Sequence, residues 1–342
     1  MALQNRGIVK TAQGRATLGS VPVPKLRDDY VLVRTVAVAL NPNDWQTLDD
    51  PFRPGTTRSL LGSDAAGTVV EVGKAVTKSF KLGDRIAGMS HSGNDLNPED
   101  GTFAEYITMK GDIAMHIPPN ISFEEAATLP SGILTVALGM YRYLELPLLA
   151  LPLEPKSTGQ PIFIYGGSSA TGTLAIQFAK LQVNPPMAHV YKDSQHDPEC
   201  GSKIREITTN SLQLVLDTIA TPSSAQICAE ALSSTGGGLY VNLMGIEMPR
   251  EDVKSIFFLG HTIRGEAFEY EGETWPAVPE DYELGKKFFA LTEKLLAMGK
   301  IQSHPAEVRS GGLGKILDGM QDMKEGRISG VKLVYRVDET GA

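Results

Sequence analysis

Residues 161–180 read PIFIYGGSSATGTLAIQFAK and combine three segments of different character. The mostly apolar residues Pro161–Tyr165 are typical of a buried strand, and apolar residues recur at helical spacing over Leu174–Leu181. The turn between them, Gly166–Gly172, carries only small side chains, so backbone N–H groups and a helix N-terminus can approach a phosphate closely. The spacing is not GxGxxG, so an ordinary tight strand–helix turn stays the alternative. We predict that this turn binds the pyrophosphate of a dinucleotide.

Length and composition limit the class of protein. A chain of 342 residues is expected to form two domains, and a net charge of −8 argues against nucleic acid as the main partner. The two cysteines, Cys200 and Cys228, indicate no disulfide framework, and the six scattered histidines show no zinc spacing, so no metal is expected. Neither a signal peptide nor a membrane span is indicated, because the longest apolar stretch, Leu144–Leu153, is short and interrupted by prolines. We expect a cytoplasmic protein.

The first third of the chain is predicted to be rich in β-strands. Tyr30–Leu40 is a long run of mainly apolar and β-branched residues, and it ends at the turn signal Asn41–Asp44. Gly62–Gly73 places glycines at both ends of a further strand, and Leu82–Gly88 and Gly101–Tyr106 continue the pattern. Short strands between glycine turns predict a barrel-like fold.

From Ser122, a candidate helix N-cap, the pattern changes to helices that alternate with strands. Helices are predicted over 135–144, 203–209 and 284–298, and strands over 212–217, 238–243 and 332–337. Alternation of this kind indicates a parallel, doubly wound sheet.

Several motifs, in this order, resemble those of the medium-chain dehydrogenase/reductase superfamily. They are Asn41-Pro42-x-Asp44, Gly62-x-Asp64-x-x-Gly67, Gly83-Asp84-Arg85, Gly101-Thr-Phe-Ala-Glu-Tyr106 and the turn from Tyr165 to Gly172. The zinc-binding cysteines of the alcohol dehydrogenase branch are absent, which points to the zinc-free quinone and enoyl reductase branches. A narrower set resembles the trans-acting enoyl reductases of fungal polyketide pathways, the lovastatin type: Arg264–Phe268, Thr274-Trp275-Pro276 and Ser329–Val334.

The resemblance implies an α/β protein in which a GroES-like β-barrel domain accompanies a doubly wound, Rossmann-like domain. The expected divisions are 1–125 for the barrel, 126–260 for the dinucleotide-binding domain, and 261–342 for the return to the barrel. The implied function is NADPH-dependent reduction of an α,β-unsaturated thioester on the acyl carrier domain of a polyketide synthase, by a monomer or homodimer. The alternatives are a free-standing quinone or enone reductase, and a cofactor-poor relative that only docks to the synthase.

The resemblance also implies the residues of the site. Thr135 is a candidate donor to the thioester oxygen or the nicotinamide, with a core threonine as the alternative, and Gln46 lies where the family often has a lysine. Gln46 keeps a hydrogen-bond donor but loses the charge, so weaker binding is expected. The implied cofactor-binding residues are Asn43, Asp44, Trp45, Gln46, Gly167, Ser168, Ser169, Ala170, Thr171, Tyr191, Leu243, Met244, Leu333 and Val334. The implied substrate-binding residues are Thr128, Leu129, Pro130, Ser131, Gly132, Ile133, Leu134, Thr135, Arg264, Gly265, Glu266, Ala267 and Phe268.

The chain departs from the family between residues 182 and 191. Only 18 residues separate Gly172 from Tyr191, where the fold needs a second strand, a second helix and a third strand. By resemblance, Val190–Asp193 ends the third strand, so we expect the domain to be shortened by one strand and one helix. In one interpretation, Met187–Tyr191 fills the position of the second strand. Tyr191 and Lys192 would then favour binding of the 2′-phosphate of NADPH, whereas Asp193 would repel it. In the other, the coding sequence is degenerate or misassembled and NADPH binds poorly.

Overall fold

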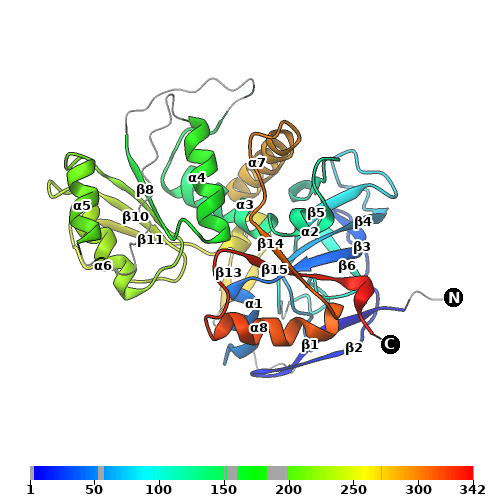
Figure 1. Ribbon diagram of the computed structural model, residues 1–342. Helices are drawn as coiled ribbons and strands as arrows, with labels where there is room; N and C mark the ends of the chain where they lie inside the picture. The colour runs from blue at the N-terminus through cyan, green and yellow to red at the C-terminus, as the bar shows by residue number, and fades with distance from the viewer. Residues whose placement is uncertain are drawn as a thin grey trace. The chain divides into compact units, whose positions relative to one another are not determined.

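The computed structural model describes residues 4–52, 58–94, 96–149, 151, 160–182, 197, 199–270 and 272–341 (Figure 1). The chain divides into two units. The first, which we call the barrel unit, is Met1–Leu134 with His261–Ala342, and the second, the nucleotide unit, is Thr135–Gly260. The barrel unit is therefore assembled from both ends of the chain, whereas the nucleotide unit is one continuous segment.

The barrel unit is built on a seven-stranded sheet in the order β14-β15-β3-β4-β5-β7, with β6 also paired to β3. All its pairs are antiparallel except β14 with β15. Two antiparallel hairpins, β1–β2 and β12–β13, accompany the sheet. The strands are β1 (Arg6–Ala12), β2 (Arg15–Ser20), β3 (Tyr30–Ala39), β4 (Asp64–Val72), β5 (Arg85–Met89), β6 (Tyr106–Lys110), β7 (Met115–His116), β12 (Phe268–Tyr270), β13 (Glu273–Trp275), β14 (Ala306–Arg309) and β15 (Lys332–Arg336).

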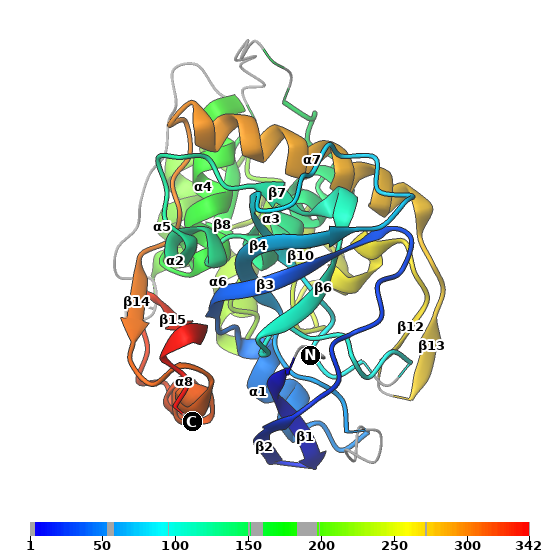
Figure 2. The same cartoon turned by 90° about the vertical axis from the view of Figure 1, so that its right-hand side faces the viewer.

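Strand β3 organises this sheet, as its long apolar run predicts (Figure 2). Strand β4 pairs along the length of β3, while β6 pairs with its first half and β15 with its last residues. In the last of these pairings, Val334 of β15 lies opposite Ala39 of β3. The C-terminal strand thus completes a sheet that begins near the N-terminus.

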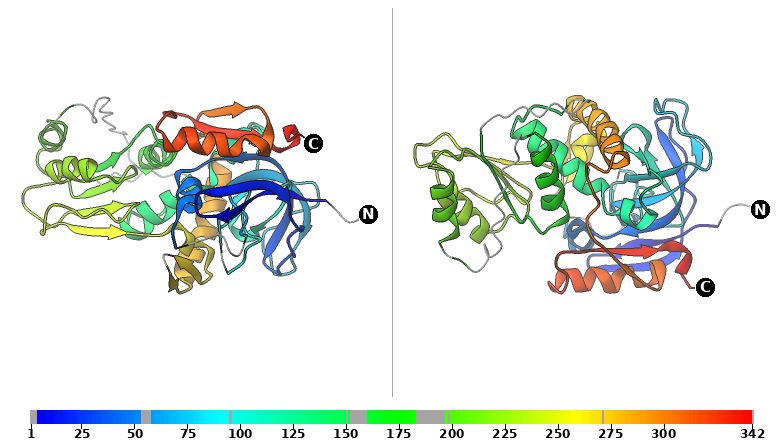
Figure 3. Two further views of the ribbon diagram at one scale, coloured as in Figure 1. Left: turned by 90° about the horizontal axis from the view of Figure 1, so that it is seen from below. Right: turned by 45° about the horizontal axis from the view of Figure 1, so that its top comes forward.

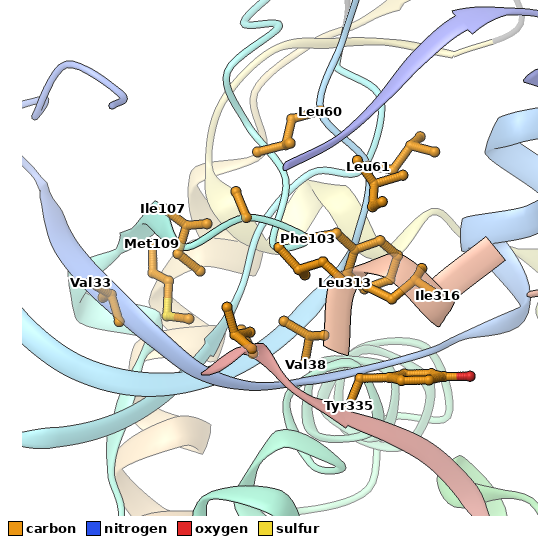
Figure 4. Close-up of a cluster of buried hydrophobic side chains, with 14 of the residues drawn as sticks. Val33, Val38, Leu60, Leu61, Phe103, Ile107, Met109, Leu313, Ile316 and Tyr335 are labelled. Atoms are coloured by element: carbon orange, nitrogen blue, oxygen red, sulfur yellow. The ribbon is translucent and has the colours of Figure 1, made fainter. Parts of the chain in front are cut away.

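The hydrophobic core of the barrel unit lies between these strands and the helices near the C-terminus (Figure 4). Phe103 and Leu61 are fully buried there, and Ile316 and Leu313 reach the same cluster from the C-terminal part of the chain. Burying side chains of this size contributes about 1.5–3 kcal/mol each. The core therefore holds both ends of the chain together.

Five α-helices belong wholly or mainly to the barrel unit: α1 (Pro42–Asp49), α2 (Phe123–Ala127), α3 (Pro130–Val136), α7 (Pro279–Ala297) and α8 (Ile316–Lys324). Helix α2 begins as predicted, because the Ser122 hydroxyl accepts from the N–H of Glu125 and the Glu125 carboxylate accepts from the N–H of Ser122. Helix α8 lies along β15 (Figure 3), and Gly319 leaves room there for the ring of Tyr335. Single turns of 3-10 helix complete the unit at Gly111–Ile113, Gly260–Arg264, Gly312–Lys315 and Val337–Glu339.

The nucleotide unit contains a four-stranded, all-parallel sheet in the order β11-β10-β9-β8. Its strands are β8 (Ile162–Tyr165), β9 (Leu214–Asp217), β10 (Leu239–Asn242) and β11 (Lys254–Phe257), and its helices are α4 (Ala170–Gln182), α5 (Cys200–Ile207) and α6 (Pro222–Ala231). Figure 1 shows α4 on one side of this sheet and α5 with α6 on the other. This is the doubly wound arrangement that the sequence predicts.

Of the predicted helix boundaries, that of 203–209 is shifted to Cys200–Ile207, and three other corrections have a clear physical reason. Asn41–Asp44, expected as a turn, begins α1, with Asn41 as N-cap, a proline in the first turn and Asp44 closing a capping box. The helix predicted over 135–144 begins earlier, at Pro130, and continues as a π-helix over Ala137–Tyr143. Helix α7 begins at Pro279 rather than residue 284, again with proline in its first turn.

Candidate active site

The turn between β8 and α4 has the backbone geometry of a phosphate-binding turn. Gly166 has a φ of 80°, which favours glycine. A Cβ atom at Gly172 would lie 2.2 Å from the carbonyl oxygen of Gly166, so only glycine lets the helix approach the strand this closely. A Cβ at Gly167 would meet only the flexible end of Ile176, at 3.1 Å. Gly166 and Gly172 thus have a steric role that a larger residue could not fill.

Hydrogen bonds from small side chains hold the same turn in place. The Ser169 hydroxyl accepts from the N–H of Gly172 at 3.0 Å and lies 2.9 Å from the hydroxyl of Thr218. Thr218 in turn donates to the carbonyl of Tyr165 at 2.8 Å. Ser168 is exposed and Gly167 half-buried, so the backbone at the start of α4 is accessible. A pyrophosphate fits this arrangement, because a helix N-terminus with small side chains offers N–H donors to an anion.

The carboxyl ends of three neighbouring strands meet beside this turn. Tyr165, Asp217 and Asn242 end β8, β9 and β10 and lie opposite one another in register. The buried carboxylate of Asp217 accepts from the hydroxyls of Ser224 and Tyr240, at 2.5 and 2.9 Å, and from two backbone N–H groups of the following loop. Asn242 likewise fixes the loop after β10 by accepting from the N–H groups of Met244 and Ile246. Ligands of open α/β sheets bind outside this edge.

Most cofactor-binding residues predicted in the nucleotide unit therefore gather at one edge of its sheet. Gly167, Ser168, Ser169, Ala170 and Thr171 follow β8, and Leu243 and Met244 follow β10. Tyr191 lies outside the described residues, as do Lys192 and Asp193 and the predicted third-strand end at 190–193.

In the barrel unit, a buried polar cluster joins three of the predicted site segments. The carboxylate of Asp64, the first residue of β4, accepts from the ammonium of Lys332 at 2.6 Å and from the side-chain amide of Asn41 at 3.0 Å. It also accepts from the N–H and hydroxyl of Ser131, at 2.8 and 2.7 Å. Lys332 donates in addition to the carbonyl of Thr128 at 3.2 Å. Segments 41–46, 128–135 and 332–334 are thereby held together.

Asp44 lies next to this cluster and is fully buried. Its carboxylate accepts from the N–H of Asn41 at 2.8 Å and from the hydroxyl of Ser63 at 3.0 Å, and Asn43 donates to Ser63 at 2.8 Å. Burial, assisted by the nearby charge of Asp64, raises the pKa of Asp44 to about 7. This carboxyl therefore changes its charge near neutral pH.

A pH-dependent stability follows from this raised pKa. Between about pH 4 and about pH 7 the folded protein keeps a proton on Asp44 that the unfolded chain releases, so the free energy of unfolding falls as the pH rises through this window, by at most about 4 kcal/mol. Asp44→Asn cannot titrate and is expected to flatten this part of the profile. Denaturant unfolding of both proteins at about pH 5 and about pH 8 measures the difference. Equal pH dependence in the two proteins would show that Asp44 is not the titrating group.

The predicted substrate segment at Arg264–Phe268 is anchored by its own charged side chains. The guanidinium of Arg264, 3% exposed, donates to the phenol of Tyr30 and to the carboxylates of Asp100 and Glu266, at 2.7–2.9 Å. Lys110 also donates to Glu266, at 2.6 Å. Positive charge lowers the pKa of Glu266 despite its burial. In the structure, the side chains of Arg264 and Glu266 thus hold this segment to the rest of the barrel unit.

The remaining predicted residues differ in their exposure. On α3 and just before it, Thr128, Leu129, Pro130, Gly132, Ile133 and Leu134 are buried. Ser131 and Thr135 are half-buried and lie one helical turn apart, so they share one face of α3. Leu333 and Val334 are fully buried in β15, and Phe268 is buried in β12. Four others are half-buried or exposed: Trp45, Gln46, Gly265 and Ala267.

No site role is predicted from the sequence for Asp64, Lys332 or Asp217. A signal was present for each: Asp64 and Lys332 lie within the quoted motifs, and all three are charged residues at the end of an apolar strand. A buried charge requires a partner, so such residues indicate a polar network.

Comparison with known proteins agrees with this architecture. The sequence pattern of the alcohol dehydrogenase GroES-like domain matches residues 27–119. The CurK enoyl reductase structure superposes with a TM-score of 0.74 at 18% identity, covering 98% of this chain and 99% of that one. The structure of the quinone oxidoreductase from Coxiella burnetii superposes with a TM-score of 0.66 at 19% identity, covering 98% of this chain and 100% of that one. The GroES-like match and the parallel sheet define a medium-chain dehydrogenase/reductase.

Sequence relatives give the narrower family. The chain is 42% identical over 351 residues to the trans-enoyl reductase ACTTS2 of Alternaria alternata, covering 98% of this chain and 100% of the relative. It is 40% identical over 361 residues to the trans-enoyl reductase resD of Aspergillus sclerotiorum, covering 97% and 100%. The chain belongs to the trans-enoyl reductases, and it is an oxidoreductase that acts on carbon–carbon double bonds with a nicotinamide cofactor. Both alignments are longer than the 342 residues of this chain, so each relative has residues without a counterpart here.

The described residues also bear on metal binding and on membrane crossing. No group of three or more His, Cys, Asp or Glu side chains in this part of the chain is arranged to bind a metal ion. Among the helices of the same residues, none combines the length and hydropathy that a membrane crossing needs.

Proposed function

We propose that this chain is a cytoplasmic, trans-acting enoyl reductase that uses NADPH to reduce an α,β-unsaturated thioester carried by the acyl carrier domain of a polyketide synthase. The observation that carries the proposal is the likeness, over almost the full length of both chains, to proteins named trans-enoyl reductases. The phosphate-binding turn supports a dinucleotide cofactor.

The nicotinamide group would supply the hydride, so the protein's part is binding, orientation and exclusion of water. In the nucleotide unit, the backbone from Gly167 to Thr171 would hold the pyrophosphate, and Leu243 and Met244 would contact the cofactor at the end of β10. In the barrel unit, Asn43, Asp44, Trp45 and Gln46 would contribute donors and surface, with Leu333 and Val334 behind them. Gln46 would donate a hydrogen bond without the charge of a lysine, so its contact with an anionic group would be weaker.

The substrate would lie against the half-buried face of α3. Negative charge develops on the thioester oxygen as the β-carbon is reduced, and a hydroxyl donor close to that oxygen stabilises the charge. Thr135 would be this donor, one turn after Ser131. Gly265 and Ala267 would offer backbone and small side chains beside the acyl chain, and Phe268 would form an apolar wall.

The shortened stretch between residues 182 and 191 favours a second candidate. We expect one strand and one helix of the fold to be absent there, and each of the two relatives has residues without a counterpart in this chain. In the second candidate, the chain docks to the synthase but binds NADPH poorly.

Calorimetry with NADPH, and with NADH as the control, distinguishes these candidates. A dissociation constant for NADPH of about 10 µM or lower, with weaker binding of NADH, is expected for the reductase. Turnover of an enoyl thioester on an acyl carrier domain should then exceed turnover of small, freely diffusing enones. Faster reduction of the small enones would favour a free-standing quinone or enone reductase, and absence of NADPH binding at about 1 mM would contradict the reductase proposal.

A further inference from the structure

The polar cluster around Asp64 contains more buried charge than the stability of the barrel unit requires. Asp44 and Asp64 are 0% exposed and Lys332 is 4% exposed, so two buried carboxyl groups lie near one buried ammonium, which is bonded to Asp64. Desolvation of such groups costs as much as their attraction returns, and an apolar replacement of a buried pair is often as stable. The ion pair of Lys332 and Asp64 is therefore better explained by the orientation that it gives to neighbouring segments than by a gain in the free energy of unfolding.

The hydrogen bonds show what that geometry is. One oxygen of Asp64 accepts both bonds from Ser131, in the first turn of α3, and the other accepts from Lys332 and Asn41. Lys332 connects the same carboxylate to the carbonyl of Thr128, just before α3. The orientation of α3, and with it the direction of Thr135, is thus fixed from strands β4 and β15.

We propose that Lys332 and Asp64 are the positioning pair of this reductase, which orients α3 and the N-cap of α1, Asn41, for reaction. The carboxylate of Asp64 pairs with the ammonium of Lys332 in a buried place, and it accepts four hydrogen bonds in all, from residues of three segments. Neither residue is assigned contact with the reacting atoms. This role in turnover rests on the proposed function, whereas the orientation of α3 can be tested without it.

The charged groups near Lys332 offer a second way to test the pair, through the pKa of Asp44. Asp44 and Asp64 face it, together with His304, whose carbonyl also accepts from Thr128. Burial raises the pKa of Asp44 and lowers that of His304; the positive charge of Lys332 opposes the rise at Asp44 and adds to the fall at His304. Removing the ammonium should therefore raise the pKa of Asp44 further, because an opposite charge favours the ionised carboxylate.

The test compares Lys332→Met, Asp64→Asn and the double variant with wild type. Lys78→Met is the matched control, because Lys78 is another mostly buried lysine of the barrel unit, bonded to Ala114 and Glu293 and outside every predicted site segment. In both single variants we expect hydrogen exchange over residues 128–136 to become about tenfold faster or more. We expect kcat to fall roughly 100-fold, as for a misplaced reacting group. The double variant should be no worse than the poorer single variant, because the two residues act together.

One further measurement and the control variant make the outcome decisive. The carboxyl 13C titration of Asp44 should move upward in Lys332→Met, and Lys78→Met should leave the exchange, the titration and kcat close to wild type. Unchanged exchange over 128–136 in Lys332→Met, wild-type kcat, or equal losses in Lys78→Met would each overturn the positioning role. If wild type itself reduces no carrier-bound enoyl substrate while exchange and titration change as expected, the proposed function fails and the orientation of α3 by this pair stands.

Discussion

Gly172→Ala is expected to weaken NADPH binding about 10- to 100-fold, the equivalent of one charge-assisted hydrogen bond to the pyrophosphate. The added Cβ would lie 2.2 Å from the carbonyl oxygen of Gly166 and 3.0 Å from the Cα of Gly167. Both are backbone atoms, so the helix and the turn must separate to relieve the clash. The free energy of unfolding of the variant should also fall by about 1–3 kcal/mol, as for other overpacked sites. Calorimetry and urea unfolding measure the two effects.

Gly314→Ala is the control for this substitution. Gly314 has no neighbouring atom within 4 Å of an added Cβ, and its φ is not in the left-handed region. Both NADPH affinity and stability should stay at the wild-type level or rise slightly, because alanine restricts the unfolded chain. Wild-type NADPH affinity in Gly172→Ala would show that the close approach of α4 to β8 is not needed for binding.

Arg264→Met is expected to destabilise the protein by about 3–5 kcal/mol, the usual cost of removing one member of a buried ionic network. Asp100 is fully buried and would lose one of its two arginine partners, because it also bonds Arg27. Glu266 would keep its bonds from Lys110 and from the hydroxyl of Tyr30. Urea unfolding followed by circular dichroism measures the loss.

Arg309→Met is the matched comparison for Arg264→Met. Arg309 also pairs with two carboxylates, Glu307 and Asp322, but its side chain is 29% exposed. Partly exposed pairs of this kind contribute about 1 kcal/mol or less. Equal destabilisation in the two variants would mean that the burial of the Arg264 network is energetically unimportant.

The elements that the sequence predicts best are those with long apolar runs. Strands β3, β4, β9, β10 and β15 and helix α4 are found within a few residues of their predicted places, because each is mostly buried on at least one face. The sequence of apolar runs also indicates the parallel sheet of the nucleotide unit.

Short or exposed strands could not be predicted in the same way. Strands β2, β11 and β14 each contain several exposed or half-buried residues, so their hydrophobic pattern is weak. Their position depends on pairing with distant strands rather than on local preference. Helix starts at Pro42 and Pro279 did carry a local signal, since proline is favoured in the first turn of a helix.

The candidate site was predicted in part. Resemblance gave the segments, but sequence spacing alone does not show that Asp64 bonds residues from segments as far apart as Ser131 and Lys332. Nor does it show that Arg264 and Glu266 are engaged within the barrel unit, because that depends on which charges the fold buries together. Which partners Asp64, Arg264 and Glu266 bond depends on which side chains are buried together, and this depends on the whole fold.

The pairing of β15 with β3 has a consequence for the order of events on the ribosome. Roughly 300 residues must be synthesised between Ala39 and its partner Val334, so the first sheet cannot close until β15 has emerged. The nucleotide unit, a continuous segment, emerges earlier and contains all four strands of its own sheet. The nascent chain therefore exposes the unpaired end of β3 until β15 has emerged, and during that time aggregation competes with the closing of the barrel unit.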